Sequence, residues 1–194
     1  MIGSLPRRLV LIRHGRTALN REDRLRGLAD PPLEELGLTQ AAALVPHMED
    51  LGLSVVHCSP LQRAMRTGAV VADALGISNL RDPRFTDRDY GPWTGRLRED
   101  VVERFGSVDR APGVEPVEVV LARVRPALDA LLDEERGVVA VVTHDAIIRP
   151  LIASIAPGAA TPHAPNGSWN ELRRDGATWS VETLDRLPDS ASDQ

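Results

Sequence analysis

Three short apolar runs, each followed directly by polar side chains, constrain most strongly how this chain can fold. The runs cover residues 8–12, 55–58 and 138–142, and β-branched residues are frequent in them. Runs of this length and composition are typical of buried strands. Segments with helical periodicity separate them, and strands that alternate with helices form a largely parallel sheet covered on both faces. We therefore predict an α/β fold, a three-layer α/β/α sandwich with a mostly parallel central sheet.

The remaining elements follow from periodicity and from helix-capping residues. Helices are predicted over 39–49, 61–75, 97–105, 117–132 and 146–155, and two closing strands over 168–172 and 179–184. Thr39 and Ser59 are the predicted N-caps of the first two helices. Residues 77–95 contain several Pro and Gly residues without clean periodicity, so we predict mostly loop there. We expect one domain over 1–186 and a polar tail over 187–194.

Composition limits the classes of partner. The chain has 194 residues and a net charge of -5, which argues against a broad nucleic-acid surface. No apolar run approaches the roughly 20 residues that a spanning helix needs, and the run at 8–12 is too short for a signal-peptide core. We expect a cytoplasmic protein without nucleic-acid or membrane partners. A dimer is possible, but the sequence does not fix the oligomeric state.

All 23 basic residues are Arg, and the chain contains no Lys. This composition excludes Schiff-base chemistry and phosphate binding through a P-loop Lys. The single cysteine, Cys58, permits no intrachain disulfide. Any anion-binding site in this chain must therefore use Arg, His and backbone N–H groups.

The three predicted strands deliver polar residues to one edge of the sheet. The first ends at Arg13 and His14, the second at Ser59 shortly before Arg63, and the third at His144. In open parallel sheets, ligands bind outside the carboxyl ends of the strands. Arg binds two phosphate oxygens with its planar fork, and a histidine can attack phosphorus while another stabilises the charge. These residues predict a phosphate-binding site that needs no cofactor. A metal site is the weaker interpretation, because no carboxylate or Cys stands at ligand spacing.

Five segments carry a resemblance to a known family. Residues 13–20 (RHGRTALN) resemble the R-H-G-x-T-x-x-N signature of the histidine phosphatase superfamily, also called phosphoglycerate mutase-like. Residues 59–67 (SPLQRAMRT) are similar to its S-P-L-x-R-A-x-x-T motif, and 142–144 (VTH) to its third motif. Residues 90–95 (YGPWTG) resemble the F-G-x-W-E-G loop, and 30–37 (DPPLEELG) the D-x-P-L-x-x-x-G segment. The matches run in family order over nearly the whole chain.

The resemblance implies a phosphoglycerate mutase-like fold and a phosphoric monoester hydrolase of the histidine acid phosphatase type. It implies that His14 is the nucleophile that becomes phosphohistidine, and that Asp87 is the general acid. It further implies that the phosphoryl oxygens are bound by Arg13, Arg63 and His144, with Asn20 assisting. The other predicted substrate-binding residues are Thr17, Arg26 and Gly27. We predict a metal-independent phosphomonoesterase that acts on a small-molecule phosphate ester.

Three departures from the family pattern concern the acid and the substrate. Asp87 replaces a Glu and is one methylene shorter, so the loop that carries it must lie closer to the leaving oxygen. Thr94 replaces the Glu of the tryptophan loop. Asp145 replaces the usual Gly after the second histidine. A carboxylate in an anion-binding site would repel substrate, so we predict that Asp145 caps the following helix.

Two alternatives to the phosphatase remain open. A phosphoglycerate mutase shares every residue of the phosphate site, but the resemblance implies a longer segment before the second histidine, and here that segment is short. The other is a non-catalytic module that binds a phosphorylated ligand and has lost the acid. The substrate also stays open among phosphoglycerates, sugar phosphates and α-ribazole phosphate. Arg24, Arg26, Arg88 and Arg96 either form a basic rim for a second anionic group or are solvated surface charges.

Overall fold

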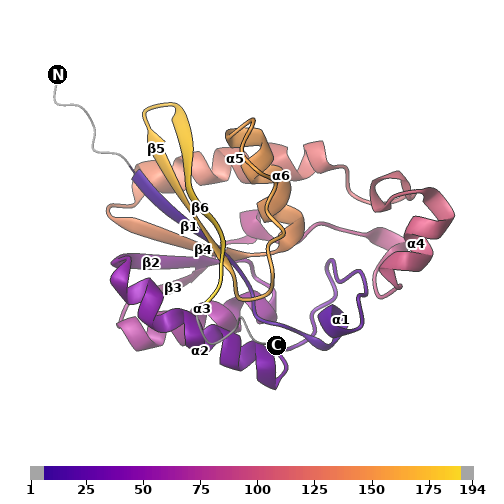
Figure 1. Ribbon diagram of the computed structural model, residues 1–194, viewed down its shortest axis with the longest axis horizontal. Coiled ribbons are helices and arrows are strands. Elements are labelled where there is room, and N and C mark those ends of the chain that lie inside the picture. Colours follow the sequence, from indigo (N-terminus) through magenta and orange to yellow (C-terminus); the bar gives the residue numbers. More distant parts are fainter. Residues whose placement is uncertain (1–6, 189–194) are drawn as a thin grey trace.

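A six-stranded sheet forms the centre of the computed structural model, which describes residues 7–188 (Figure 1). The strand order is β3-β2-β4-β1-β5-β6. The first four of these strands are mutually parallel. Strand β5 pairs antiparallel with β1, and β6 pairs antiparallel with β5. The strands are β1 (Arg7–Arg13), β2 (Leu53–Cys58), β3 (Ser78–Arg81), β4 (Val138–Thr143), β5 (Trp169–Asp175) and β6 (Thr178–Arg186). The mostly parallel sheet is as predicted.

Helices cover both faces of the sheet. Successive residues of a strand point to opposite faces, and in the central strands both sets are apolar, so both faces must be buried. Leu9 and Leu11 of β1 pack in one core cluster with α5 and α6, and Val10 and Ile12 pack in a second cluster with α2 and α3. Figure 1 shows these two helix layers on either side of the strands. The helices are α1 (Ala18–Arg21), α2 (Glu35–Asp50), α3 (Gln62–Leu75), α4 (Arg98–Phe105), α5 (Val117–Glu134) and α6 (Asp145–Ile155). The predicted three-layer α/β/α sandwich is confirmed.

A smaller lobe lies beyond the carboxyl ends of the parallel strands. It contains α4 and the short 3-10 turns η2 (Gly91–Trp93) and η3 (Val108–Arg110), and η1 (Pro83–Phe85) leads toward it from β3. Its own small core includes Leu25, Tyr90 and Val101. Figure 1 shows α4 well separated from the helix layers of the sheet. This lobe stands at the edge of the sheet where the predicted site lies.

Three local predictions were wrong. Helix α2 begins at Glu35 rather than after Thr39, whose hydroxyl donates to the Glu35 carbonyl inside the helix. Ser59 is not an N-cap, because α3 begins at Gln62 and its N-cap is Leu61. Residues 78–81, predicted as loop, form the edge strand β3. An edge strand with mostly exposed side chains carries no apolar alternation that a sequence pattern could detect.

The predicted polar tail begins at Leu187, and residues 189–194 of it lie outside the described part of the chain. No helix within residues 7–188 is both long enough and apolar enough to span a membrane.

Candidate active site

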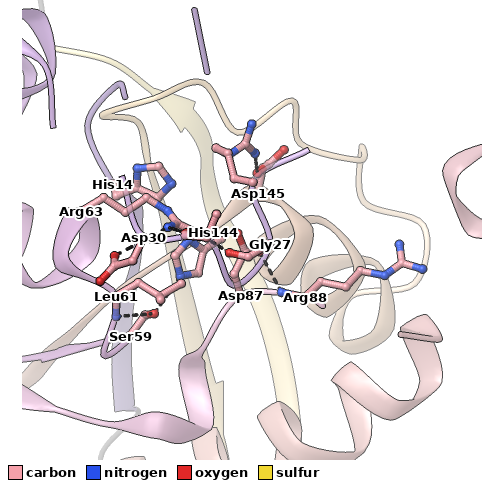
Figure 2. A network of polar contacts seen from close by, with 12 residues as sticks. His14, Gly27, Asp30, Ser59, Leu61, Arg63, Asp87, Arg88, His144 and Asp145 are labelled. Carbon is pink, nitrogen blue, oxygen red and sulfur yellow. Dashed lines mark hydrogen bonds and ion pairs between the residues drawn. The ribbon is translucent and has the colours of Figure 1, made fainter. Parts of the chain in front are cut away.

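The carboxyl ends of β1, β2 and β4 bring the predicted site residues together. These strands are neighbours in the sheet, and their backbones stay paired beyond it. The His14 N–H donates to the Thr143 carbonyl at 3.1 Å, and the Ser59 N–H donates to the Val142 carbonyl at 3.0 Å. Figure 2 shows His14, Arg63, His144 and Asp87 close together at this edge. The site is thus built on three neighbouring strands of the sheet.

His14 is completely buried and is held in one tautomer. Its Nδ1 lies 2.7 Å from the carbonyl oxygen of Gly15. Since a carbonyl only accepts, Nδ1 carries the proton and Nε2 keeps its lone pair. Burial lowers the pKa of His14 well below its ordinary value, and the nearby charges of Arg63 and His144 lower this pKa further. His14 is therefore a neutral imidazole with a free nucleophilic nitrogen.

Gly15 leaves no room for a side chain next to His14. A Cβ atom at Gly15 would lie 2.2 Å from the carbonyl oxygen of Gly37. The Gly15 N–H donates to the hydroxyl of Thr67 at 3.0 Å. These contacts fix the carbonyl that orients the His14 ring.

His144 faces His14, with 5.1 Å between the ring centroids. A 2.8 Å hydrogen bond joins its Nε2 to the hydroxyl of Ser59, so Ser59 orients a site residue instead of capping α3. Its Nδ1 has no hydrogen-bond partner within residues 7–188 and lies 3.5 Å from Oδ2 of Asp87. Burial lowers the pKa of His144 well below its ordinary value, and the positive charges of Arg63 and Arg26 add to this effect.

Backbone carbonyls hold the guanidinium groups of Arg13 and Arg63 in place. Arg13 donates to the Ala164 carbonyl at 2.6 Å. Arg63, which has no exposed surface, donates to the carbonyls of Ala29 at 2.7 Å and Gly27 at 2.9 Å. Gly27 thus contributes its backbone, with a φ of +49° that favours glycine. Both guanidinium groups are ordered before any ligand binds.

Thr17 and Asn20 form the cap of α1. The Thr17 hydroxyl and N–H both donate to Oδ1 of Asn20, at 2.9 and 3.1 Å. This capping box occupies the Thr17 side chain and fixes the Asn20 amide, whose Nδ2 stays without a partner. Thr17 therefore orients Asn20, and only Asn20 has a free donor.

Buried donors without partners concentrate on the predicted site residues. Within residues 7–188, seven buried side-chain nitrogen or oxygen atoms have no hydrogen-bond partner, and six of them belong to these residues. An unsatisfied buried polar group costs about 1–3 kcal/mol, so a fold keeps such a set only where something binds. The six atoms are Arg13 Nε, His14 Nε2, Asn20 Nδ2, Arg26 Nε, Arg63 Nε and His144 Nδ1. Apart from the lone pair of His14, this set suits an anion with several oxygens.

Asp87 is brought to the same site despite its short side chain. Its Oδ2 accepts a hydrogen bond from Arg63 at 2.8 Å. Burial raises the pKa of the Asp87 carboxyl, and the guanidinium groups of Arg63 and Arg26 oppose this rise only in part. A buried carboxyl with a raised pKa in a cluster of charged side chains is typical of functional sites.

A family model described as the histidine phosphatase superfamily (branch 1) matches residues 9–186. The chain belongs to this family. The resemblance found in the sequence motifs is thereby confirmed. Among the described residues of this histidine phosphatase, no group of three or more His, Cys, Asp and Glu side chains lies close enough to hold a metal ion.

Relatives of the chain include phosphatases and mutases. "Bifunctional protein Rv2228c" of Mycobacterium tuberculosis is 34% identical over 158 residues, and the match covers 76% of this chain but only 43% of that protein. Phosphoserine phosphatase 1 of Hydrogenobacter thermophilus is 31% identical over 159 residues, 76% of this chain and 75% of that protein. A 2,3-bisphosphoglycerate-dependent phosphoglycerate mutase of Azorhizobium caulinodans is 33% identical over 168 residues, 76% of this chain and 81% of the mutase.

One solved structure is similar over almost its whole length. The mycobacterial glucosyl-3-phosphoglycerate phosphatase Rv2419c, in complex with VO3, superposes with a TM-score of 0.82 at 28% identity. The similarity covers 92% of this chain and 98% of that one. The arrangement of strands and helices in this member of the histidine phosphatase superfamily is therefore shared with a solved phosphatase.

Asp145 departs from the prediction. It is the first residue of α6, the N-cap is His144, and no side chain caps this helix. The Oδ1 atom of Asp145 instead accepts from Arg26 at 2.6 Å and lies 3.5 Å from a guanidinium nitrogen of Arg13. Burial alone would raise the pKa of Asp145, but these two guanidinium groups hold it well below its ordinary value. The two guanidinium groups give the Asp145 carboxylate cationic partners, whereas a helix cap would give it only a backbone N–H.

Of the candidate rim arginines, only Arg26 joins the phosphate site. Arg24 pairs with Glu22 at 2.8 Å, and Arg88 pairs with Asp109 at 2.6 Å. Arg96 is exposed. A basic rim was one of the two possibilities for these arginines. Arg24 and Arg88 instead form ion pairs with carboxylates of the protein itself.

Sequence reasoning missed the residues that hold residues 84–89, the segment that carries the candidate acid Asp87 and is called the acid loop below. Arg123 of α5 donates to the carbonyls of Arg84 at 2.9 Å and Asp87 at 3.1 Å. Glu115 accepts from the Asp89 N–H at 3.0 Å and returns its own N–H to the Asp89 carbonyl at 2.8 Å. Arg123 carries no local signal, because its partners are 36 and 39 residues away.

Proposed function

We propose that this histidine phosphatase is a metal-independent phosphomonoesterase that acts on a small-molecule phosphate ester through phosphohistidine at His14. The observation that carries the proposal is the neutral, oriented His14, whose free Nε2 is buried among unpartnered donors. A nucleophile needs a lone pair at the operating pH, and the strongly lowered pKa of His14 provides one.

In the first step, His14 Nε2 attacks phosphorus and the bond from phosphorus to the ester oxygen breaks. Arg13, Arg63 and His144 bind the three phosphoryl oxygens, and Asn20 Nδ2 and Arg26 Nε add donors. Because these groups are held by the fold before substrate arrives, they stabilise the developing charge without reorganisation. The raised pKa of Asp87 favours the protonated carboxyl that would give its proton to the leaving alkoxide.

In the second step, water attacks the phosphorus of phosphohistidine and the bond from phosphorus to Nε2 breaks. Asp87, now ionised, takes a proton from this water and returns to its starting state. His14 is released as neutral imidazole, and phosphate leaves. The two steps together convert one phosphate ester and one water into an alcohol and inorganic phosphate.

Hydrolysis rather than mutase activity is favoured by the short connection between the acid loop and the second histidine. From Asp87 to His144, the chain contains only η2, α4, η3, α5 and β4. Little chain is then available to shield phosphohistidine from water while a second substrate binds.

The test is phosphate release from a panel of alkyl, aryl and sugar phosphates in the presence of EDTA. The wild-type protein should release phosphate, and His14→Ala should lose roughly 10³-fold or more of this activity. His163→Ala, which removes an exposed histidine outside the site, is the matched control and should behave as wild type. Activity that disappears under EDTA, or that survives in His14→Ala, would overturn the proposal.

The same panel separates the two alternatives. With 3-phosphoglycerate and 2,3-bisphosphoglycerate present, a mutase would form 2-phosphoglycerate faster than it releases phosphate. A binding module would turn over no aryl phosphate, although inorganic phosphate would still stabilise its fold. The proposal requires phosphate release to dominate in both experiments.

A further inference from the structure

A cavity of about 460 Å³ lies next to the Asp145 carboxylate, which contacts Arg13 and Arg26. Asp145 forms part of its wall, together with residues of the α4 lobe and of α6. Small-molecule sites usually have volumes of roughly 300–1,000 Å³, so the cavity can hold an alcohol of sugar size. The inference rests on the proposed function: in a phosphate ester bound at the site, the alcohol part would occupy this cavity.

Polar groups of both signs line the cavity. Arg98 and Arg149 contribute donors, Asp109 and Asp145 contribute acceptors, and Ser107 and Tyr90 contribute hydroxyl groups. A hydroxyl group donates one hydrogen bond and accepts two, so a polyol can use both kinds of partner. An alkyl chain could use none of them.

Asp145 presents an acceptor at the point where this cavity meets the phosphate site. Its Oδ1 accepts from Arg26 at 2.6 Å, whereas Oδ2 takes part in no hydrogen bond within residues 7–188. The side chain keeps 13% of its surface exposed. Because the neighbouring guanidinium groups keep Asp145 ionised, it can only accept. Asp145 therefore offers an acceptor in the wall of the cavity.

The surrounding charges select among possible donors. Arg26 and Arg13 both lie within 3.5 Å of Oδ1, so one carboxylate faces two guanidinium groups. An ammonium group or a carboxylate at this point would meet a charge of its own sign as well as the opposite one, which offsets part of the attraction. A neutral hydroxyl group suits all three side chains.

We propose that Asp145 is a specificity-determining residue that accepts a hydrogen bond from a hydroxyl group of the substrate, and that the substrate is therefore a phosphate ester of a polyol or sugar. The hydroxyl belongs to the carbon next to the phosphorylated one or to a near neighbour. The outer cavity, lined by Arg98 and Arg149, binds the rest of the polyol.

The test compares three phosphate esters of similar size: glycerol 1-phosphate, propyl phosphate and O-phosphoethanolamine. The wild-type kcat/KM for glycerol 1-phosphate should exceed that for each of the others by about tenfold or more, since a hydrogen bond to a charged acceptor contributes that much. In Asp145→Ala, the advantage of glycerol 1-phosphate over propyl phosphate should fall to less than about threefold. The control Glu118→Gln, at an exposed position of α5, should keep the wild-type ratio.

A purely structural role of Asp145, holding Arg13 and Arg26, predicts a different result. Both esters would then lose activity by the same factor in Asp145→Ala, and their ratio would not change. That result would overturn the proposal, and so would a wild-type preference for propyl phosphate or for O-phosphoethanolamine.

A binding measurement separates this inference from the proposed function. In His14→Ala, which removes the nucleophile but keeps the cavity, calorimetry gives the dissociation constants of glycerol 1-phosphate and propyl phosphate. Tighter binding of glycerol 1-phosphate by about tenfold, lost in His14→Ala/Asp145→Ala, supports the specificity role even if the wild-type protein hydrolyses neither ester. Equal binding of the two, or binding of neither, overturns the specificity role whatever the activity assay shows.

Discussion

Oδ2 of Asp87 lies 2.8 Å from a guanidinium nitrogen of Arg63, and neither side chain has any exposed surface. Arg63 is itself fixed by the carbonyls of Gly27 and Ala29. One arginine thus connects the phosphate site to the candidate acid. Asp87 is one methylene shorter than the Glu that it replaces. The contact with Arg63 shows that the Asp87 side chain nevertheless reaches the site, because its loop lies close enough.

Asp87→Asn should affect alkyl esters much more than aryl esters. The amide keeps the shape of the carboxyl group but cannot deliver a proton, and general acid catalysis contributes typically 10²- to 10⁴-fold. An aryl leaving group needs little protonation, so p-nitrophenyl phosphate should lose about tenfold or less. The measurement is kcat/KM for both ester types, with the exposed Asp73→Asn of α3 as the control. Equal losses on both ester types would show that Asp87 is not the acid.

Inorganic phosphate should stabilise the protein strongly. The site holds six unpartnered buried atoms, five of which can serve an anion as donors. At a phosphate concentration 100 times Kd, the free energy of unfolding should rise by about 2.7 kcal/mol, which corresponds to a Tm increase of roughly 5–10 °C for a domain of this size. Arg13→Gln should lose most of this shift in differential scanning fluorimetry, and the exposed Arg136→Gln should keep it. A Tm that phosphate does not change in the wild type contradicts an anion site.

Acidification should destabilise the protein between pH 6.5 and about pH 5. The pKa values of His14 and His144 lie well below their unfolded value of 6.5 in the folded state, so in this range the unfolded chain binds protons that the folded chain does not. Asp87 contributes to the pH dependence of stability with the opposite sign, because its pKa is raised in the folded state. The contribution of this one carboxyl opposes those of two histidines. The net loss is about 1 kcal/mol per pH unit, measurable by urea unfolding in phosphate-free buffer. Rising stability over this range would mean that the two imidazoles are charged in the folded protein.

Arg123→Gln should disturb the acid without disturbing the phosphate site. Arg123 holds the carbonyls of Arg84 and Asp87, so its loss should loosen the acid loop and lower kcat for alkyl esters by about tenfold or more. Inhibition by inorganic phosphate and the activity on aryl esters should change little. Arg125→Gln, on the same helix but bonded to Ser154, is the matched control. If KM rises for both ester types while kcat stays constant, Arg123 has no positioning role toward Asp87.

The sequence predicts the parallel core and the phosphate site because both depend on local patterns. Buried strands appear as apolar runs, and the runs that become β1, β2 and β4 end at the residues that meet in the site. The edge strand β3 has no such run, because its side chains are largely exposed. Ser59 and Asp145 were assigned to helix caps by a local rule, whereas their actual partners are His144 and Arg26, 85 and 119 residues away.

Pairings over such separations depend on the tertiary fold. The Arg123 contacts with the acid loop belong to the same class. Local patterns therefore predict which residues reach the site, but they do not predict the hydrogen bonds and ion pairs that these residues form with one another. For this chain, the tertiary contacts place Asp145 next to Arg26 and Arg13 rather than at a helix cap.

The most direct test of the central claim is to trap the phosphorylated enzyme. The protein is mixed with a ³²P-labelled phosphate ester, quenched within milliseconds in alkali, and the labelled peptide is sequenced by mass spectrometry. The account predicts an alkali-stable, acid-labile phosphohistidine at His14, which forms and decays at rates consistent with turnover and is absent from His14→Ala. Turnover without label on His14, or label on another residue that persists in His14→Ala, would contradict it.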